Sequence, residues 1–161
     1  MVTWEKASRE VIRTAENLIE EFHPWLKNAR VGFMFRSEAP KQNGKEVWGK
    51  AEKVSDKWRE LLDEPLDFII WLAKDVWDER LDIRQKRALV DHELCHCTIE
   101  IGEAKMRPHD VEEFTCIIER HGLWKKDLEQ MARVMDEVYQ PSLLFGGGVV
   151  SVELKKAESM L

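Results

Sequence analysis

Two histidines and a glutamate in the stretch His92-Glu93-Leu94-Cys95-His96 have the residue types and the spacing of a metal-dependent hydrolytic site. On an α-helix, residues four apart lie within about 40° of each other, so both imidazoles can bind one divalent ion. Glu93 is turned by about 100° from His92, which keeps it out of the ligand pair but within reach of a metal-bound water. The pattern predicts one zinc ion per chain, with its own general base.

A catalytic zinc has three protein ligands and one open position, so a third ligand must come from outside this helix. His109 is the first candidate, because it directly precedes a predicted helix start at Asp110 and can point back towards the metal. Glu112 and Glu113, on the first turn of that predicted helix, are the alternatives. They would make a two-histidine, one-glutamate site.

Four further residues are candidates for supporting roles around the metal. Asp91 and Asp110 can orient ligand imidazoles through hydrogen bonds, although capping a helix also accounts for Asp110. Tyr139, the only tyrosine of the chain, and His121 are the candidate donors to a developing oxyanion. The sequence places neither of them near the metal.

Composition limits the classes of protein to consider. A chain of 161 residues with 43% hydrophobic residues and seven tryptophans is typical of one globular domain, which we assign to residues 1–145. Residues 146–161, which begin with three glycines, are expected to form a flexible tail or an edge strand. A net charge of -6 argues against direct nucleic-acid binding. Neither a signal peptide nor an apolar run of about 18 residues is evident, which predicts a cytoplasmic protein with no membrane span.

The first half of the chain predicts a helix and a sheet of roughly three strands. Apolar residues at steps of three and four predict a helix that begins after Thr3 and ends at His23-Pro24. Residues 31–35 alternate as a strand does, and residues 47–54, after a turn, are expected to return as its partner. The apolar run 67–73 predicts a strand that is buried on both faces.

The second half predicts three helices. The motif helix is expected from a cap at Asp82 to a stop at Gly102, with Cys97 and Ile101 among the residues that pack it against the sheet. A second helix is expected from Asp110 to Gly122, and a third spans residues 128–138. The predicted fold class is therefore α+β.

The segment from Asp91 to His96, followed by Arg107-Pro108-His109-Asp110 and a helix with Phe114, resembles the SprT-like zinc metallopeptidases. More narrowly it resembles a family of short metallopeptidases found in phage and prophage genomes. The resemblance covers about residues 30–124, and its specific part is residues 91–114. It implies a small zincin-like fold with His92, His96 and His109 as zinc ligands and Glu93 as the base. A phage-encoded protein would work in the cytoplasm of its bacterial host. The chain has no cysteine spacing for the zinc ribbon, and no basic patch for the DNA-binding segment, that larger SprT-like proteins carry.

The function that this resemblance and these residues favour is hydrolysis of peptide bonds in a protein or peptide substrate. Glu93 would activate a zinc-bound water for attack on the carbonyl. Two alternatives stay open. One is a non-catalytic binding protein that zinc stabilises, with Cys95 or Cys97 as a fourth ligand. The other is a zinc amidohydrolase that acts on an amide outside proteins.

Overall fold

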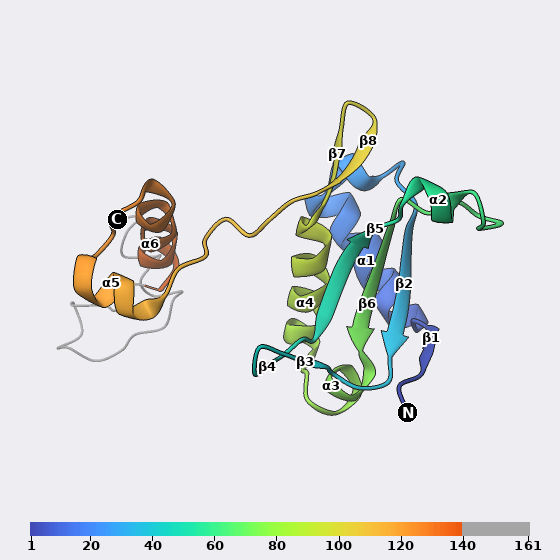
Figure 1. The fold of residues 1–161 in the computed structure, drawn as a ribbon, viewed down its shortest axis with the longest axis horizontal. Coiled ribbons are helices and arrows are strands. Elements are labelled where there is room, and N and C mark those ends of the chain that lie inside the picture. The colour runs from blue at the N-terminus through green and yellow to red at the C-terminus, as the bar shows by residue number, and fades with distance from the viewer. Residues whose placement is uncertain (140–161) are drawn as a thin grey trace. The chain divides into compact units, whose positions relative to one another are not determined.

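The structure, a computed structural model, describes residues 1–139 of the chain. It divides into two compact units, Met1–Pro108 and His109–Leu161, and each is described by itself (Figure 1). The assignment of residues 1–145 to one domain stays a prediction. The predicted tail, residues 146–161, lies outside the described residues.

A four-stranded sheet forms the centre of the first unit, with the strand order β1-β2-β6-β5. β2 and β6 run parallel, whereas β1 and β5 are antiparallel to their neighbours. The strands are β1 (Trp4–Lys6), β2 (Val31–Arg36), β5 (Gly49–Lys53) and β6 (Phe68–Ala73). The prediction of a strand at residues 67–73 is confirmed, because β6 is central and each of its residues except the half-buried Ile69 is buried. Its dense apolar composition is what a strand with covered faces requires.

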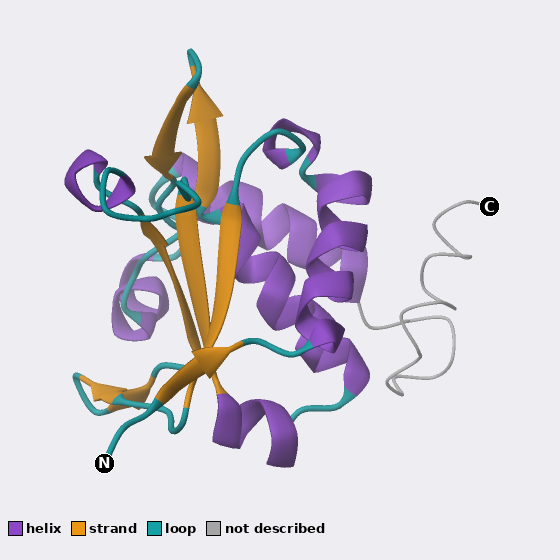
Figure 2. Cartoon of the chain, turned by 90° about the vertical axis from the view of Figure 1, so that its right-hand side faces the viewer, coloured by secondary structure: helices purple, strands orange, loops and turns teal. Residues whose placement is uncertain are grey.

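Two helices, α1 (Arg9–Phe22) and α4 (Ile83–Cys95), cover one face of this sheet (Figure 2). Phe68, Ile70 and Leu72 of β6 point to that face and are fully buried, as the alternation of side chains along a strand requires. The helices supply the other half of the core through the following buried residues: Val11, Ala15, Leu18, Val90 and Leu94. This packing holds the motif helix against the sheet.

Smaller elements connect these parts of the first unit. They are η1 (Pro24–Leu26), β3 (Lys41–Gln42), β4 (Lys45–Glu46), α2 (Asp56–Arg59) and α3 (Lys74–Glu79). β3 and β4 form a hairpin at the turn that the sequence predicts, with positive φ at Asn43 and Gly44. The expectation that residues 47–54 pair with the first strand is wrong. β5 pairs with β6, which lies between β5 and β2.

The N-terminus differs from its prediction as well. Residues Trp4–Lys6 form β1 instead of the first helical turn, and α1 begins at Arg9 after Ser8. Trp4 pairs with Arg36 across the strands, and its ring meets the edge of Trp71 at a centroid distance of 5.9 Å. These long-range contacts outweigh the local helical pattern, and β1 makes the sheet one strand wider than expected.

The motif helix begins where the sequence predicts and ends earlier. Asp82 caps α4 in a reciprocal capping box with Gln85. The helix stops at Cys95, not at Gly102, and the chain turns back as a hairpin of β7 (Cys97–Glu100) and β8 (Glu103–Met106). Ile101 and Gly102 form its two-residue loop with φ of 51° and 76°. Gly102 is therefore a hairpin glycine and not a helix stop.

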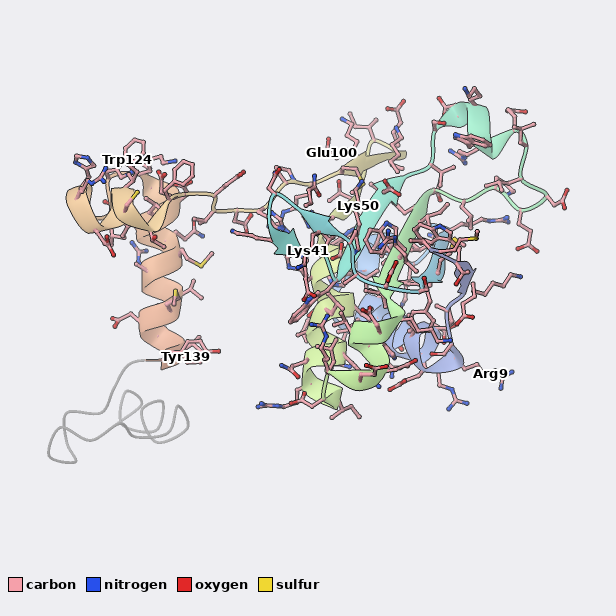
Figure 3. All side chains as sticks on the ribbon, turned by 60° about the horizontal axis from the view of Figure 1, so that its bottom comes forward. Arg9, Lys41, Lys50, Glu100, Trp124 and Tyr139 are labelled. Carbon is pink, nitrogen blue, oxygen red and sulfur yellow. The ribbon has the colours of Figure 1, made fainter. Side chains whose placement is uncertain are left out.

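The second unit contains α5 (Thr115–His121) and α6 (Lys126–Tyr139), and Figure 3 labels Trp124 and Tyr139 near the two ends of α6. A helix start at Asp110 is wrong, because α5 begins at Thr115 after Phe114 in an extended conformation. The predicted end at Gly122 and the following helix are confirmed. In residues 1–139 no helix is both long and apolar enough to span a membrane.

Candidate metal centre

The two histidines of the motif lie side by side at the C-terminal end of α4. His92 is exposed and His96 is half-buried. Their ring centroids are 5.1 Å apart with an interplanar angle of 79°. His96 caps the helix with helical backbone angles, so the four-residue spacing still brings both rings to one face although the helix ends at Cys95.

The hairpin after α4 fixes the orientation of His96. Its Nδ1–H donates to the backbone carbonyl of Arg107 at 2.7 Å, and the amide of Arg107 donates to the carbonyl of His96 at 2.8 Å. Because a carbonyl only accepts hydrogen bonds, Nδ1 must carry the proton. The neutral ring therefore presents the lone pair of Nε2 as a metal donor.

His109 follows Arg107 by two residues, a span of at most about 7 Å of chain. It is the first residue of the second unit. One ring nitrogen from each of His92, His96 and His109 lies within 4.8 Å of the other two. Three neutral imidazoles are a donor set that suits zinc and other borderline divalent ions, so the residues present fit a metal of this kind.

Glu93 is buried beside these histidines, with 5% of its surface exposed. Burial raises the pKa of its carboxyl to about 7, while the electrostatic interaction with His96 and a hydrogen bond from the amide of Ala51 act to lower the pKa. A carboxyl with a pKa near neutrality can both accept and return a proton under ordinary conditions. Such a group next to three metal donors is an arrangement found at catalytic sites.

The edge strand β5 supports Glu93 because of the register of the sheet. Trp48 and Val54 bond to β6 through their backbones, so the odd-numbered residues between them point their amides away from β6. The amide of Ala51 can therefore donate to the carboxylate of Glu93. A Cβ at Gly49 would lie 3.0 Å from Oε1 of Glu93, so the strand approaches the carboxylate as closely as it does because this residue has no side chain.

The acidic alternatives for the third ligand lie in the segment before α5. Glu113 accepts a hydrogen bond from the amide of Phe114 at 2.9 Å, and this bond, together with Lys125, holds the pKa of the carboxyl below its usual value. Glu112 and Asp110 are exposed. Neither glutamate belongs to the groups of three or more donors found among residues 1–139.

Of the other candidates, Asp91 bonds to a histidine that is not in the motif: the Nε2–H of His23 donates to its Oδ1 at 2.6 Å. His121 is the last residue of α5, and Tyr139, which is 68% exposed, is the last residue of α6. Their role as oxyanion donors stays a prediction. Sequence reasoning missed Gly49, Ala51 and Arg107, because each acts through its backbone and carries no side-chain signal.

Together, a small α+β zincin-like fold and a histidine cluster with a buried glutamate define a candidate metal-dependent hydrolase. Comparison with known families narrows this class: residues 2–138 match the family described as "Putative phage metallopeptidase". Because the match covers most of the chain, the protein belongs to this family. Membership implies a metal and a peptidase-type site, which agrees with the donors that the structure brings together. No curated protein and no solved structure matches the chain.

Proposed function

We propose that the protein is a zinc-dependent peptidase in which His92, His96 and His109 hold the metal and Glu93 is the catalytic base. The observation that carries this proposal is the burial of Glu93 beside a group of three histidine donors. A purely structural site has no use for a buried carboxylate that is not a ligand, and burying one is costly. The match to the metallopeptidase family supports the same reading.

The metal would contribute Lewis acidity, which lowers the pKa of water towards about 7 and polarises a carbonyl group. The protein contributes the orientation of the metal-binding side chains. The carbonyl of Arg107 holds His96 in the tautomer that leaves Nε2 available. A preset tautomer avoids the free-energy cost of reorienting the ring when the site is loaded.

Glu93 would remove the proton of the attacking water and deliver it to the nitrogen of the leaving amine. In the metal-free protein its pKa is raised to about 7 by burial, and a nearby cation lowers the pKa of a carboxyl. The loaded site would therefore keep Glu93 ionised, and ready to accept a proton, at neutral pH. The amide of Ala51 holds the carboxylate in place for both transfers.

The edge of β5 favours a peptide over another amide as the substrate. The backbone groups of Gly49 and Lys53, like those of Ala51, point away from β6 because of the antiparallel register. An extended peptide can hydrogen bond along such an edge. A small amide outside proteins would make no use of a row of backbone groups beside the carboxylate.

The alternative of a closed, non-catalytic zinc site needs a fourth protein ligand, for which Cys95 and Cys97 are the candidates. Cys97 is fully buried, burial raises the pKa of its thiol to about 12, and its sulfur faces the carbonyl of Glu93 at 3.7 Å. Cys95 groups with His23 and Asp91, not with the three histidines. These placements favour an open coordination position, which catalysis requires.

Replacement of Glu93 by glutamine tests the assignment of the base. Glu93→Gln should lower peptidase activity on an unfolded protein substrate at least about a hundredfold, the lower end of the range for loss of a general base. Zinc content, measured by plasma mass spectrometry, should stay equal to that of the wild type. Glu52→Gln, which changes an exposed carboxylate on the same strand as Ala51, is the matched control and should keep full activity. Loss of zinc in Glu93→Gln would instead make Glu93 a ligand.

Two further variants test the third ligand. His109→Ala should weaken zinc binding at least about tenfold, whereas Glu113→Ala should leave the affinity unchanged, because Glu113 already bonds within its own segment. Competition with a chromogenic chelator measures both affinities. The reverse order of effects would move the third ligand to Glu113.

A further inference from the structure

A second cluster of metal-binding side chains lies on a different face of α4. Asp91 and Cys95 are four residues apart on this helix, and His23 follows the end of α1. One donor atom from each of these three residues lies within 4.8 Å of the other two. Asp91 and Cys95 are each turned by about 100° around the helix from the neighbouring histidine of the motif, so they face a different side of α4. The two clusters share no residue.

The ring of His23 is buried, with 3% of its surface exposed, and its hydrogen bonds are incomplete. Nε2 lies 2.6 Å from Oδ1 of Asp91, whereas Nδ1 has no hydrogen-bond partner within residues 1–139. If Nε2 carries the proton, the lone pair of Nδ1 is buried without a donor. If Nδ1 carries it, that N–H is buried without an acceptor. In either neutral tautomer, the residues that the structure describes leave Nδ1 without a partner, so protein alone does not fully satisfy the ring.

The surroundings hold this ring in place. The backbone amide of His23 bonds to the carbonyls of Leu18 and Ile19 at the end of α1. The ring of Trp25 meets its edge at a centroid distance of 5.2 Å, and the Nε1–H of Trp25 donates to the carbonyl of Cys97 at 3.0 Å. The ring of His23 is therefore held in one orientation. The side chains of the cluster that can move to accommodate an ion are Asp91 and Cys95, on α4.

We propose that His23, Asp91 and Cys95 form a second zinc-binding site, separate from the three-histidine site. Nitrogen, oxygen and sulfur donors together suit a borderline-soft ion such as zinc, whereas magnesium and calcium require oxygen ligands. A carboxylate and a thiolate balance the charge of a divalent ion, so the loaded cluster is neutral where His23 is buried. The thiol of Cys95 releases its proton to solvent on binding.

The geometry requires only a small adjustment. Zinc bonds of about 2.0–2.3 Å place tetrahedral ligands roughly 3.3–3.8 Å apart, which lies between the 2.6 Å of the bonded pair and the 4.8 Å limit of the cluster. The side chain of Asp91 is 37% exposed, which gives the ion a path from solvent and leaves room for water as a fourth ligand. A zinc ion there would join the end of α1 to the helix that carries the catalytic motif.

Cobalt(II) separates the two sites by spectroscopy, because only the second one contains a thiolate. Metal-free, tag-free protein is titrated with cobalt chloride while the visible and near-ultraviolet spectrum is recorded. Two equivalents should bind, and one of them should bring the intense thiolate-to-cobalt charge-transfer absorption. This absorption should persist in His92→Ala, which disables the first site, and should disappear in Cys95→Ser. Cys116→Ser, which changes an exposed thiol in α5, is the matched control and should keep it.

Binding of a single equivalent without the charge-transfer absorption would overturn the second site and leave the proposed peptidase untouched. Absorption that survives Cys95→Ser in full would also overturn it. Far-ultraviolet circular dichroism confirms that each variant is folded. His23→Gln adds a test that needs no thiol change, since it should lose the same absorption while keeping the equivalent that binds to the three histidines.

Discussion

The buried carboxyl of Glu93 should destabilise the metal-free protein at neutral and alkaline pH, and Glu93→Gln should remove that cost. The side chain is 95% buried, and in the metal-free protein only the amide of Ala51 and the neighbouring His96 favour its charged form. Glutamine has nearly the same shape, and its carbonyl oxygen can accept the same bond from Ala51. The substitution therefore changes charge while preserving packing.

The size of the effect follows from the pKa of Glu93. The carboxyl has an ordinary value of 4.5 and a value of about 7 in the folded protein, a difference worth roughly 3 kcal/mol at 1.36 kcal/mol per pKa unit. Because the folded pKa is the higher one, the folded state binds the proton more tightly. Its stabilising effect is fully present below pH 4.5 and is lost as the pH rises through about 7. Glu93→Gln should thus have nearly wild-type stability at low pH and exceed it by up to about 3 kcal/mol near pH 8.

Urea unfolding in the presence of a chelator, followed by the fluorescence of the tryptophans, measures this difference at several pH values. Subtracting the free energy of unfolding of the variant from that of the wild type at each pH cancels the contributions of the titratable groups that the two proteins share. Glu52→Gln serves as a control, because its exposed carboxylate pairs with Lys50 and should change stability by less than about 1 kcal/mol at any pH. A stability difference between wild type and Glu93→Gln that is the same at every pH would refute the reasoning.

Three other substitutions test separate parts of the structure. Gly49→Ala should lower kcat about threefold to tenfold without loss of metal, because the new Cβ lies 3.0 Å from Oε1 of Glu93 and must displace it by a few tenths of an ångström. Equal peptidase rates in the variant and the wild type would contradict the expectation that a Cβ at this position displaces the carboxylate of Glu93. Ile101→Asn should raise the free energy of unfolding by about 1 kcal/mol, since a β-branched residue is strained at a φ of 51° whereas asparagine accepts it. Asp82→Ala should lower the free energy of unfolding by about 1 kcal/mol through loss of the capping box with Gln85, and thermal unfolding measures both changes.

The parts of the fold that could be predicted are those that local chemistry determines. Asp82 and Gln85 mark the start of the motif helix because their capping bonds are made within one turn. The run Phe68–Ala73 identifies the central strand because its residues are apolar without alternation. The same holds for the pair His92 and His96, whose closeness follows from helix geometry alone.

The parts that could not be predicted depend on contacts between distant segments. Trp4 fits a helical pattern, yet pairing with Arg36 and packing against Trp71 place it in a strand. Nothing near residues 49–53 indicates that β6, and not β2, will be the partner of this strand. The end of α4 cannot be read from Gly102, because this residue suits a helix stop and a hairpin loop equally well. Likewise, the backbone of Arg107 and the amide of Ala51 support the site without any signal in their residue types.

The hairpin that joins β7 to β8 has a consequence for how the spacing between the motif and His109 can vary. Cys97 pairs with Met106 at its base, and Arg107 bonds twice to His96, so the place of Arg107 beside His96 is set at the base and not at the tip. Lengthening both strands by one residue each would move only the loop. Chains in which the proposed third ligand follows the motif at an interval that differs by an even number of residues would keep this base, and a search pattern with one fixed interval would miss them. An odd insertion would shift the register and turn the pairing residues to the opposite face.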